Sequence, residues 1–237
     1  MTVRVERYHA RWHQSLRFVA QRLVLWPVVR SVTRTQVQGR DNLSSLDGCF
    51  VLVANHSSHL DATLLVTQLP YRHTRRLAVA AAHDYFYRTW WQRAATSVFY
   101  NVYPVDRDGS GVGKGLSRRL LSQEIPLLIF PEGSRARDGI MQPFRRGAAH
   151  LCVSHKVPCV PVALSGTHEA MPVGTAWPKS GRPPVTMMIG QPMSPSPAEK
   201  TREFNERIAE RISTMLIKQT PYVGTDDPDD DVQKEGL

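Results

Sequence analysis

The sequence predicts an α/β fold with a mostly parallel central sheet flanked by helices. Short apolar runs rich in β-branched residues alternate along the chain with longer segments whose apolar residues have helical spacing. Two polar motifs each directly follow such a run, as loops do at the carboxyl ends of buried parallel strands. With 237 residues, of which 41% are hydrophobic, the chain can form one domain with a sizeable core.

A separate N-terminal segment, residues 1–38, is predicted to be an amphipathic helix that associates with membranes. Its apolar and aromatic residues recur every three or four positions, at Tyr8, Trp12, Leu16, Val19, Leu23 and Trp26. Arginines are interleaved among them, as in helices that lie in a lipid headgroup layer. A helix packed on the domain with its arginines exposed is the alternative. The longest apolar run of the segment, 23–29, is too short to span a bilayer.

Residues 39–220 are predicted to form the α/β domain, which begins with a turn between Gly39 and Gly48. The expected strands cover 49–54, 77–82, 102–107, 125–129, 157–164 and 185–189. The expected helices cover 61–68, 116–123, 145–156 and 198–218. Residues 221–237 carry six acidic residues, one lysine and almost nothing apolar, which predicts a disordered tail.

The net charge of +9 predicts an anionic partner: a phosphate-bearing substrate, an anionic lipid or a nucleic acid. Nucleic acid is disfavoured, because no binding motif appears and the aromatic residues concentrate at 85–103, apart from most arginines. That aromatic cluster predicts either ordinary core or an apolar surface or tunnel for a long apolar group. The three cysteines lie in apolar contexts, which predicts buried free thiols.

The first motif, residues 55–61, follows the predicted strand 49–54 and supplies a histidine with a carboxylate five residues later. If His56 lies in the loop and Asp61 opens the next helix, the carboxylate can accept the Nδ1 proton and leave Nε2 as a general base. Asp61 as a mere helix N-terminal acid is the alternative. His59 is a less favoured base, because residues two apart diverge in a helix. A metal site formed by His56, His59 and Asp61 is also disfavoured, since no second histidine cluster appears.

The second motif, residues 130–135, follows the predicted strand 125–129. Gly133 permits a sharp turn close to a ligand, and the planar guanidinium of Arg135 suits a phosphate. Glu132 can hold that guanidinium or bond a substrate hydroxyl. Arg107, at the end of another predicted strand, is a second phosphate candidate. A strand end with a turn and an ion pair is the alternative interpretation of the motif.

Together these motifs resemble those of the glycerolipid acyltransferase family, which includes bacterial 1-acyl-glycerol-3-phosphate acyltransferases. The chain has the H-x4-D block of that family at 56–61 and its F-P-E-G-S-R block at 130–135. Val105-Asp106-Arg107 resembles the block whose arginine contacts glycerol phosphate, and 144–148, 160–164 and 189–192 also fit. The resemblance covers residues 40–215 in order.

This resemblance implies direct acyl transfer from acyl-CoA or acyl-acyl carrier protein to the free hydroxyl of 1-acyl-sn-glycerol-3-phosphate. It implies His56 as base, oriented by Asp61, and no metal or organic cofactor. It implies an acceptor seated by Arg107, Glu132, Gly133, Ser134 and Arg135. It further implies a peripheral or monotopic enzyme on the cytoplasmic face of an anionic membrane, with an acyl carrier protein as a possible partner. The alternatives are another acceptor, such as glycerol-3-phosphate or another lysophospholipid, and a lipid-binding protein without catalysis.

Overall fold

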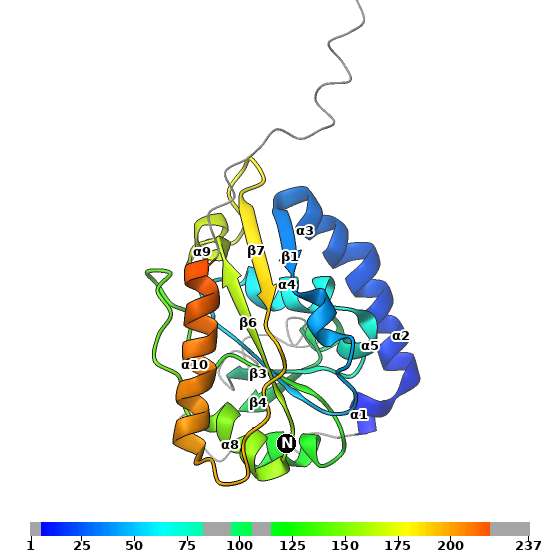
Figure 1. Ribbon diagram of the computed structural model, residues 1–237. Helices are drawn as coiled ribbons and strands as arrows, with labels where there is room; N and C mark the ends of the chain where they lie inside the picture. The colour runs from blue at the N-terminus through cyan, green and yellow to red at the C-terminus, as the bar shows by residue number, and fades with distance from the viewer. Residues whose placement is uncertain (1–5, 83–95, 106–114, 219–237) are drawn as a thin grey trace, which may run out of the picture.

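A seven-stranded sheet forms the centre of the protein in the computed structural model, which describes residues 6–82, 96–105 and 115–218. Figure 1 shows the arrangement of its elements. The strand order is β1-β7-β6-β2-β5-β3-β4. In chain order the strands are β1 (Arg34–Gln38), β2 (Val51–Ala54), β3 (Ala78–Ala82), β4 (Val102–Val105), β5 (Leu127–Ile129), β6 (Cys159–Ser165) and β7 (Pro184–Ile189). All neighbouring pairs are parallel except β6 with β7. The prediction of a mostly parallel sheet is therefore confirmed.

Helices cover both faces of the sheet because its buried strands are apolar on both sides. Val51 and Val53 of β2 face a core that includes side chains of α7 (Leu116–Leu121), α8 (Gly147–His155) and α10 (Thr201–Lys218). The alternate residues Leu52 and Ala54 face a second core with side chains of α4 (Leu60–Gln68). Shorter helical pieces of the domain are η2 (Arg40–Leu43), α5 (Tyr71–Thr74) and α9 (Thr167–Ala170), and residues 96–100 are also helical.

The N-terminal segment is helical, with a break at Ala10 followed by an unbroken helical run over residues 11–32. It consists of α1 (Glu6–His9), α2 (Arg11–Ala20), the π-helical turn η1 (Gln21–Leu25) and α3 (Trp26–Val32). The prediction that the helical segment reaches residue 38 is wrong, because residues 34–38 form β1, which pairs in parallel with β7 at the edge of the sheet. The backbone becomes extended at Thr33, whose hydroxyl bonds the carbonyl of Val29.

In α2 and η1 the residues buried against the domain are polar. Arg17 and Gln21 are buried, and their side chains donate hydrogen bonds to the backbone carbonyls of Arg75 and Phe99. The opposite face is apolar and exposed, with Trp12 at 68% and Leu23 at 72% exposure. In the part of the chain that the structure describes, no helix is long and apolar enough to cross a membrane.

Several predictions concern residues that the structure does not describe. The acidic tail 221–237, most of the aromatic cluster at 85–103 and Arg107 lie outside the described ranges. Of that cluster, Tyr103 is fully buried, and the hydroxyl of Tyr100 bonds the Thr63 hydroxyl at 2.8 Å. The three cysteines are free thiols, of which Cys152 and Cys159 are buried and Cys49 is partly buried.

Candidate active site

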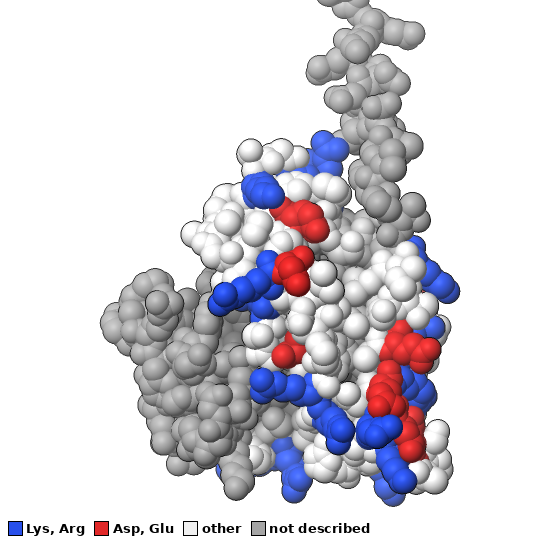
Figure 2. Space-filling view, turned by 90° about the vertical axis from the view of Figure 1, so that its left-hand side faces the viewer, with Lys and Arg blue, Asp and Glu red and all other residues white. Residues whose placement is uncertain are grey.

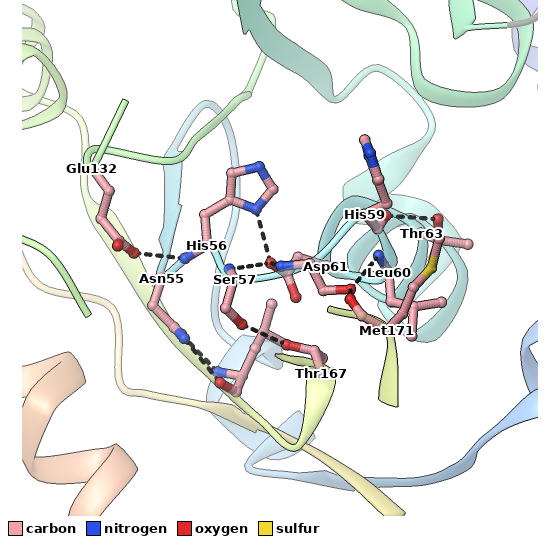
Figure 3. A network of polar contacts seen from close by, with 12 residues as sticks. Asn55, His56, Ser57, His59, Leu60, Asp61, Thr63, Glu132, Thr167 and Met171 are labelled. Carbon is pink, nitrogen blue, oxygen red and sulfur yellow. Dashed lines mark hydrogen bonds and ion pairs between the residues drawn. The ribbon is translucent and has the colours of Figure 1, made fainter. Parts of the chain in front are cut away.

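The two sequence motifs meet at the carboxyl end of the sheet. β2 lies between β5 and β6 and runs parallel to both, so the loops that leave these three strands emerge side by side. The first motif follows β2, the second follows β5, and Thr167 follows β6. In open α/β sheets ligands bind at this edge. Figure 3 shows the resulting network of polar side chains around His56 and Asp61.

Asp61 binds the ring of His56 and shapes the loop that carries it. Because α4 begins at Leu60, Asp61 lies in its first turn while His56 remains in the preceding loop. The Oδ2 atom of Asp61 accepts hydrogen bonds from Nδ1 of His56 and from the backbone N–H groups of Ser57 and Ser58, each at 2.8 Å. An ionised carboxylate only accepts hydrogen bonds, so this contact places the proton on Nδ1 and leaves Nε2 as the basic nitrogen.

The two side chains of the pair differ in their exposure to solvent. Asp61 is fully buried, and its Oδ1 atom has no hydrogen-bond partner among the described residues. The His56 side chain is 19% exposed, so its ring can meet a substrate. The ring of Phe130 stacks on it with 4.0 Å between centroids and 19° between planes. The carboxylate and the stacked ring together fix both the tautomer and the plane of the imidazole.

The side chain of Asn55 holds the end of β2 against β6. Its amide donates to the carbonyl of Leu164 at 2.9 Å and accepts the Leu164 N–H at 2.8 Å, as a peptide group in a strand would. The hydroxyl of Ser57 bonds that of Thr167 at 3.0 Å, and the hydroxyl of Ser58 donates to the carbonyl of Met171. The loop between β2 and α4 is therefore attached to the segment that follows β6.

Glu132 attaches the same loop to the segment that follows β5. Its carboxylate accepts the backbone N–H of His56 at 2.6 Å through Oε1 and that of Gln142 at 2.8 Å through Oε2. Burial raises the pKa of Glu132, and the two backbone N–H groups oppose that rise. The backbone N–H of Ala136 donates to the carbonyl of His56 at 2.8 Å. Both the N–H and the carbonyl of residue 56 are thus bonded to the segment 132–136, which begins in the second motif.

The glycine turn of the second motif lies under an arginine side chain. Gly133 has φ of +80°, and a Cβ atom placed there would lie 2.9 Å from Nε of Arg145. Ser134 is exposed, whereas one terminal nitrogen of Arg135 is buried without a hydrogen-bond partner in the described ranges. Loss of hydration and then the positive charge of Arg135 lower the pKa of His59 to about 4. The Arg135 guanidinium therefore acts electrostatically on the loop that carries His56.

The structure brings together six of the seven predicted site residues: His56, Asp61, Glu132, Gly133, Ser134 and Arg135. The seventh, Arg107, is outside the described ranges. The ring of His59 projects away from Asp61, whose carboxylate contacts His56 (Figure 3). Sequence reasoning assigned no role to Asn55 or Thr167. For Asn55 the sequence did offer a signal, namely a polar residue directly after an apolar strand. For Thr167 the sequence offered no such signal.

Known proteins resemble the chain in sequence and in fold. A family model described as Acyltransferase matches residues 34–165. A chloroplastic 1-acyl-sn-glycerol-3-phosphate acyltransferase, BAT2 of Brassica napus, is 29% identical over 174 residues, which are 72% of this chain and 47% of that protein. The alpha 1-acyl-sn-glycerol-3-phosphate acyltransferase of Homo sapiens is 34% identical over 125 residues, 51% of this chain and 42% of that protein. The chain thus spans about half the length of these relatives.

The crystal structure of the 1-acyl-sn-glycerophosphate (LPA) acyltransferase PlsC from Thermotoga maritima has the same fold. It superimposes with a TM-score of 0.63 at 20% sequence identity, over 86% of this chain and 83% of that one. The family match covers more than half of the chain and includes both motifs of the site. The protein therefore belongs to the acyltransferase family.

Proposed function

We propose that the protein transfers a fatty acyl group from an acyl thioester to the free hydroxyl of 1-acyl-sn-glycerol-3-phosphate, giving phosphatidate. The observation that carries this proposal is the partly exposed imidazole of His56, held by the buried Asp61 carboxylate at 2.8 Å beside the Gly133 turn. The names of the matched relatives support the choice of acceptor.

The proposed reaction is a single displacement. Nε2 of His56 takes the proton of the acceptor hydroxyl as its oxygen attacks the thioester carbonyl carbon. The carbon–sulfur bond then breaks, and the leaving thiolate takes the proton back from the imidazolium. Asp61 stabilises the imidazolium because its carboxylate faces Nδ1. The protein's residues supply all the proton transfers, so we propose no cofactor; acyl-CoA and acyl-acyl carrier protein are both suitable donors.

We assign the acceptor phosphate and glycerol to the second motif. The Gly133 turn lets the Arg145 side chain lie close to the backbone of the motif, Ser134 is exposed, and Arg135 has a buried nitrogen without a described partner. A guanidinium fork binds phosphate oxygens in a bidentate manner. Arg107 is proposed as a further phosphate ligand on the basis of the sequence alone.

We propose that α2 and η1 lie on the cytoplasmic surface of an anionic membrane, which makes the enzyme peripheral or monotopic. The outward apolar face of these helices supports this placement, since it includes Trp12, Leu16, Val19 and Leu23, all exposed. Arg11 and Arg22 are exposed on the same segment and would face anionic headgroups.

An acceptor panel with a labelled acyl thioester tests the proposal. The full chain would be given lysophosphatidate, glycerol-3-phosphate and a neutral-headgroup lysophospholipid in turn, with acyl-CoA or acyl-acyl carrier protein as donor. Lysophosphatidate should be the best acceptor, His56→Ala should abolish transfer, and His150→Ala, an exposed histidine on α8, should not. A different best acceptor refutes the assigned substrate, and vesicle binding without any transfer points to a lipid-binding protein.

A further inference from the structure

We infer that Glu132 is a positioning residue that fixes the main chain of His56 relative to the loop carrying Arg135, and that it does not bind the acceptor. This inference rests on the proposed function, because it assigns a role within the same site. It departs from the role that the sequence suggested for Glu132, a bond to the guanidinium or to a substrate hydroxyl.

Both oxygens of Glu132 already have partners within the protein. Oε1 accepts the N–H of His56 at 2.6 Å and Oε2 accepts the N–H of Gln142 at 2.8 Å. The residue is only 6% exposed. A glycerol hydroxyl would have to displace one of these bonds, and a buried N–H without a partner costs about 1–3 kcal/mol. The carboxylate is therefore poorly placed to bind the acceptor. It holds two backbone N–H groups in position instead, and we call this pair of hydrogen bonds the Glu132 brace.

The hydrogen bonds of Glu132 connect His56 to both ends of the segment 132–142. The contact of Glu132 with Gln142 joins the two ends of the segment 132–142, which carries Arg135. The same segment bonds the other side of residue 56, since the N–H of Ala136 donates to the His56 carbonyl at 2.8 Å. In Figure 3 the Glu132 carboxylate points at the backbone nitrogen of His56, on the opposite side from the imidazole.

This arrangement sets the separation between the imidazole and the Arg135 guanidinium. The proposed acceptor carries its phosphate and its reacting hydroxyl on one glycerol unit, so both ends must fit at once. A misplacement of about 1 Å can cost about 10²-fold in rate. Loss of the brace should therefore lower kcat, while the affinity for a ligand that contacts Arg135 alone stays the same.

Glu132→Gln tests the role without changing the size of the side chain. The amide oxygen can accept one N–H, but the amide NH2 group faces the other N–H and cannot accept it. We expect kcat to fall about 10- to 100-fold. The inhibition constant of inorganic phosphate, used as a competitor of the acceptor, should stay within threefold of the wild-type value. Glu210→Gln, the same change at an exposed position of α10, should change neither quantity.

A second variant breaks the brace from the other end. Gln142→Pro removes the N–H that binds Oε2 and leaves the Glu132 carboxylate unchanged, so kcat should fall in the same direction. An unchanged kcat in Glu132→Gln would overturn the inference. So would a rise beyond threefold in the phosphate inhibition constant of Glu132→Gln, whether or not kcat falls.

An amide readout separates this inference from the proposed function. In the wild-type protein the His56 amide proton should resonate downfield and exchange slowly, because it is donated to a carboxylate. Glu132→Gln should move that resonance upfield and speed its exchange, whereas Glu210→Gln should not. A His56 amide that does not respond overturns the inference even if the wild-type chain transfers acyl groups. A wild-type chain that transfers none, with the amide response intact, refutes only the proposed function.

Discussion

Replacing Asp61 by asparagine should remove most of the acyl transfer and also destabilise the fold. The Oδ2 atom of Asp61 accepts three hydrogen bonds, one from the His56 ring and two from backbone N–H groups, and the side chain is fully buried. An amide oxygen can still accept from the backbone, but a neutral acceptor no longer favours the protonated imidazole. The amide NH2 group would take the place of Oδ1, which has no partner among the described residues.

The structure allows both losses to be estimated. Hydrogen bonds to charged groups contribute about 1.5–3 kcal/mol and neutral ones about 0.5–1.5 kcal/mol, so three weakened bonds amount to roughly 3 kcal/mol of unfolding free energy. In a chain of this size, that corresponds to a fall in Tm of about 6–12 °C. A general base contributes about 10²–10⁴ in rate, so kcat should fall toward the upper end of that range.

Thermal unfolding by circular dichroism and transfer of a labelled acyl group to lysophosphatidate would measure the two effects on the same preparation. Asp41→Asn, an exposed acid in η2, is the matched control and should leave both unchanged. The reasoning fails if Asp61→Asn keeps more than about a hundredth of the wild-type kcat. A wild-type Tm in that variant would refute the estimate of stability.

Three other outcomes follow from the geometry. Gly133→Ala should lower the free energy of unfolding by about 1–2 kcal/mol, because residue 133 has a left-handed backbone. It should also weaken acyl transfer, because the new methyl group would clash with the Arg145 side chain. The control Gly48→Ala, at φ of +76° with open space around it, should affect only stability. Because the pKa of His59 is lowered to about 4, its ring should titrate near pH 4 when followed by NMR, and a midpoint near 6.5 would contradict this. The neutral His59 ring should contribute to the free energy of unfolding above pH 6.5, and that contribution should be lost as the pH falls from 6.5 toward 4. Trp12→Ala should reduce flotation with anionic vesicles, and Trp177→Ala, another exposed tryptophan, should not; equal losses would exclude α2 as the membrane contact.

The sequence predicted the elements whose residues are buried on both faces. The strands that became β2, β5 and β6 are continuous apolar runs, and each lies within two residues of its expected start. β1 was missed because only Val37 is apolar in Arg34–Gln38, so the strand has the polar composition of an edge and follows directly on a helix. Polar edge strands are identified by their pairing, which a single sequence does not contain.

The candidate site was partly predictable for a similar reason. His56 and Asp61 are only five residues apart. Because α4 begins between them, the local course of the backbone is enough to bring their side chains together. The contacts of Glu132 were not predictable, because its partners are backbone N–H groups of residues 76 and 10 positions away. Every residue except proline carries such a group, so no side-chain pattern marks it.

The orientation of the N-terminal helices was also beyond the sequence. Helical spacing separates an apolar face from a polar one, but it does not say which face the domain binds. Here Arg17 and Gln21 face inward because backbone carbonyls of Arg75 and Phe99 accept their hydrogen bonds. The acceptors belong to the main chain, so they too leave no trace in the pattern of residues.

The junction at Thr33 ties the orientation of the N-terminal helices to that of the sheet. One residue separates the last turn of α3 from β1, and its hydroxyl bonds both Val29 and Thr35. Within the residues that the structure describes, no flexible linker separates α3 from the sheet, so on a membrane bound as we propose the sheet would turn together with these helices. On such a membrane, the proposed lipid acceptor would have to reach the imidazole of His56 from one direction.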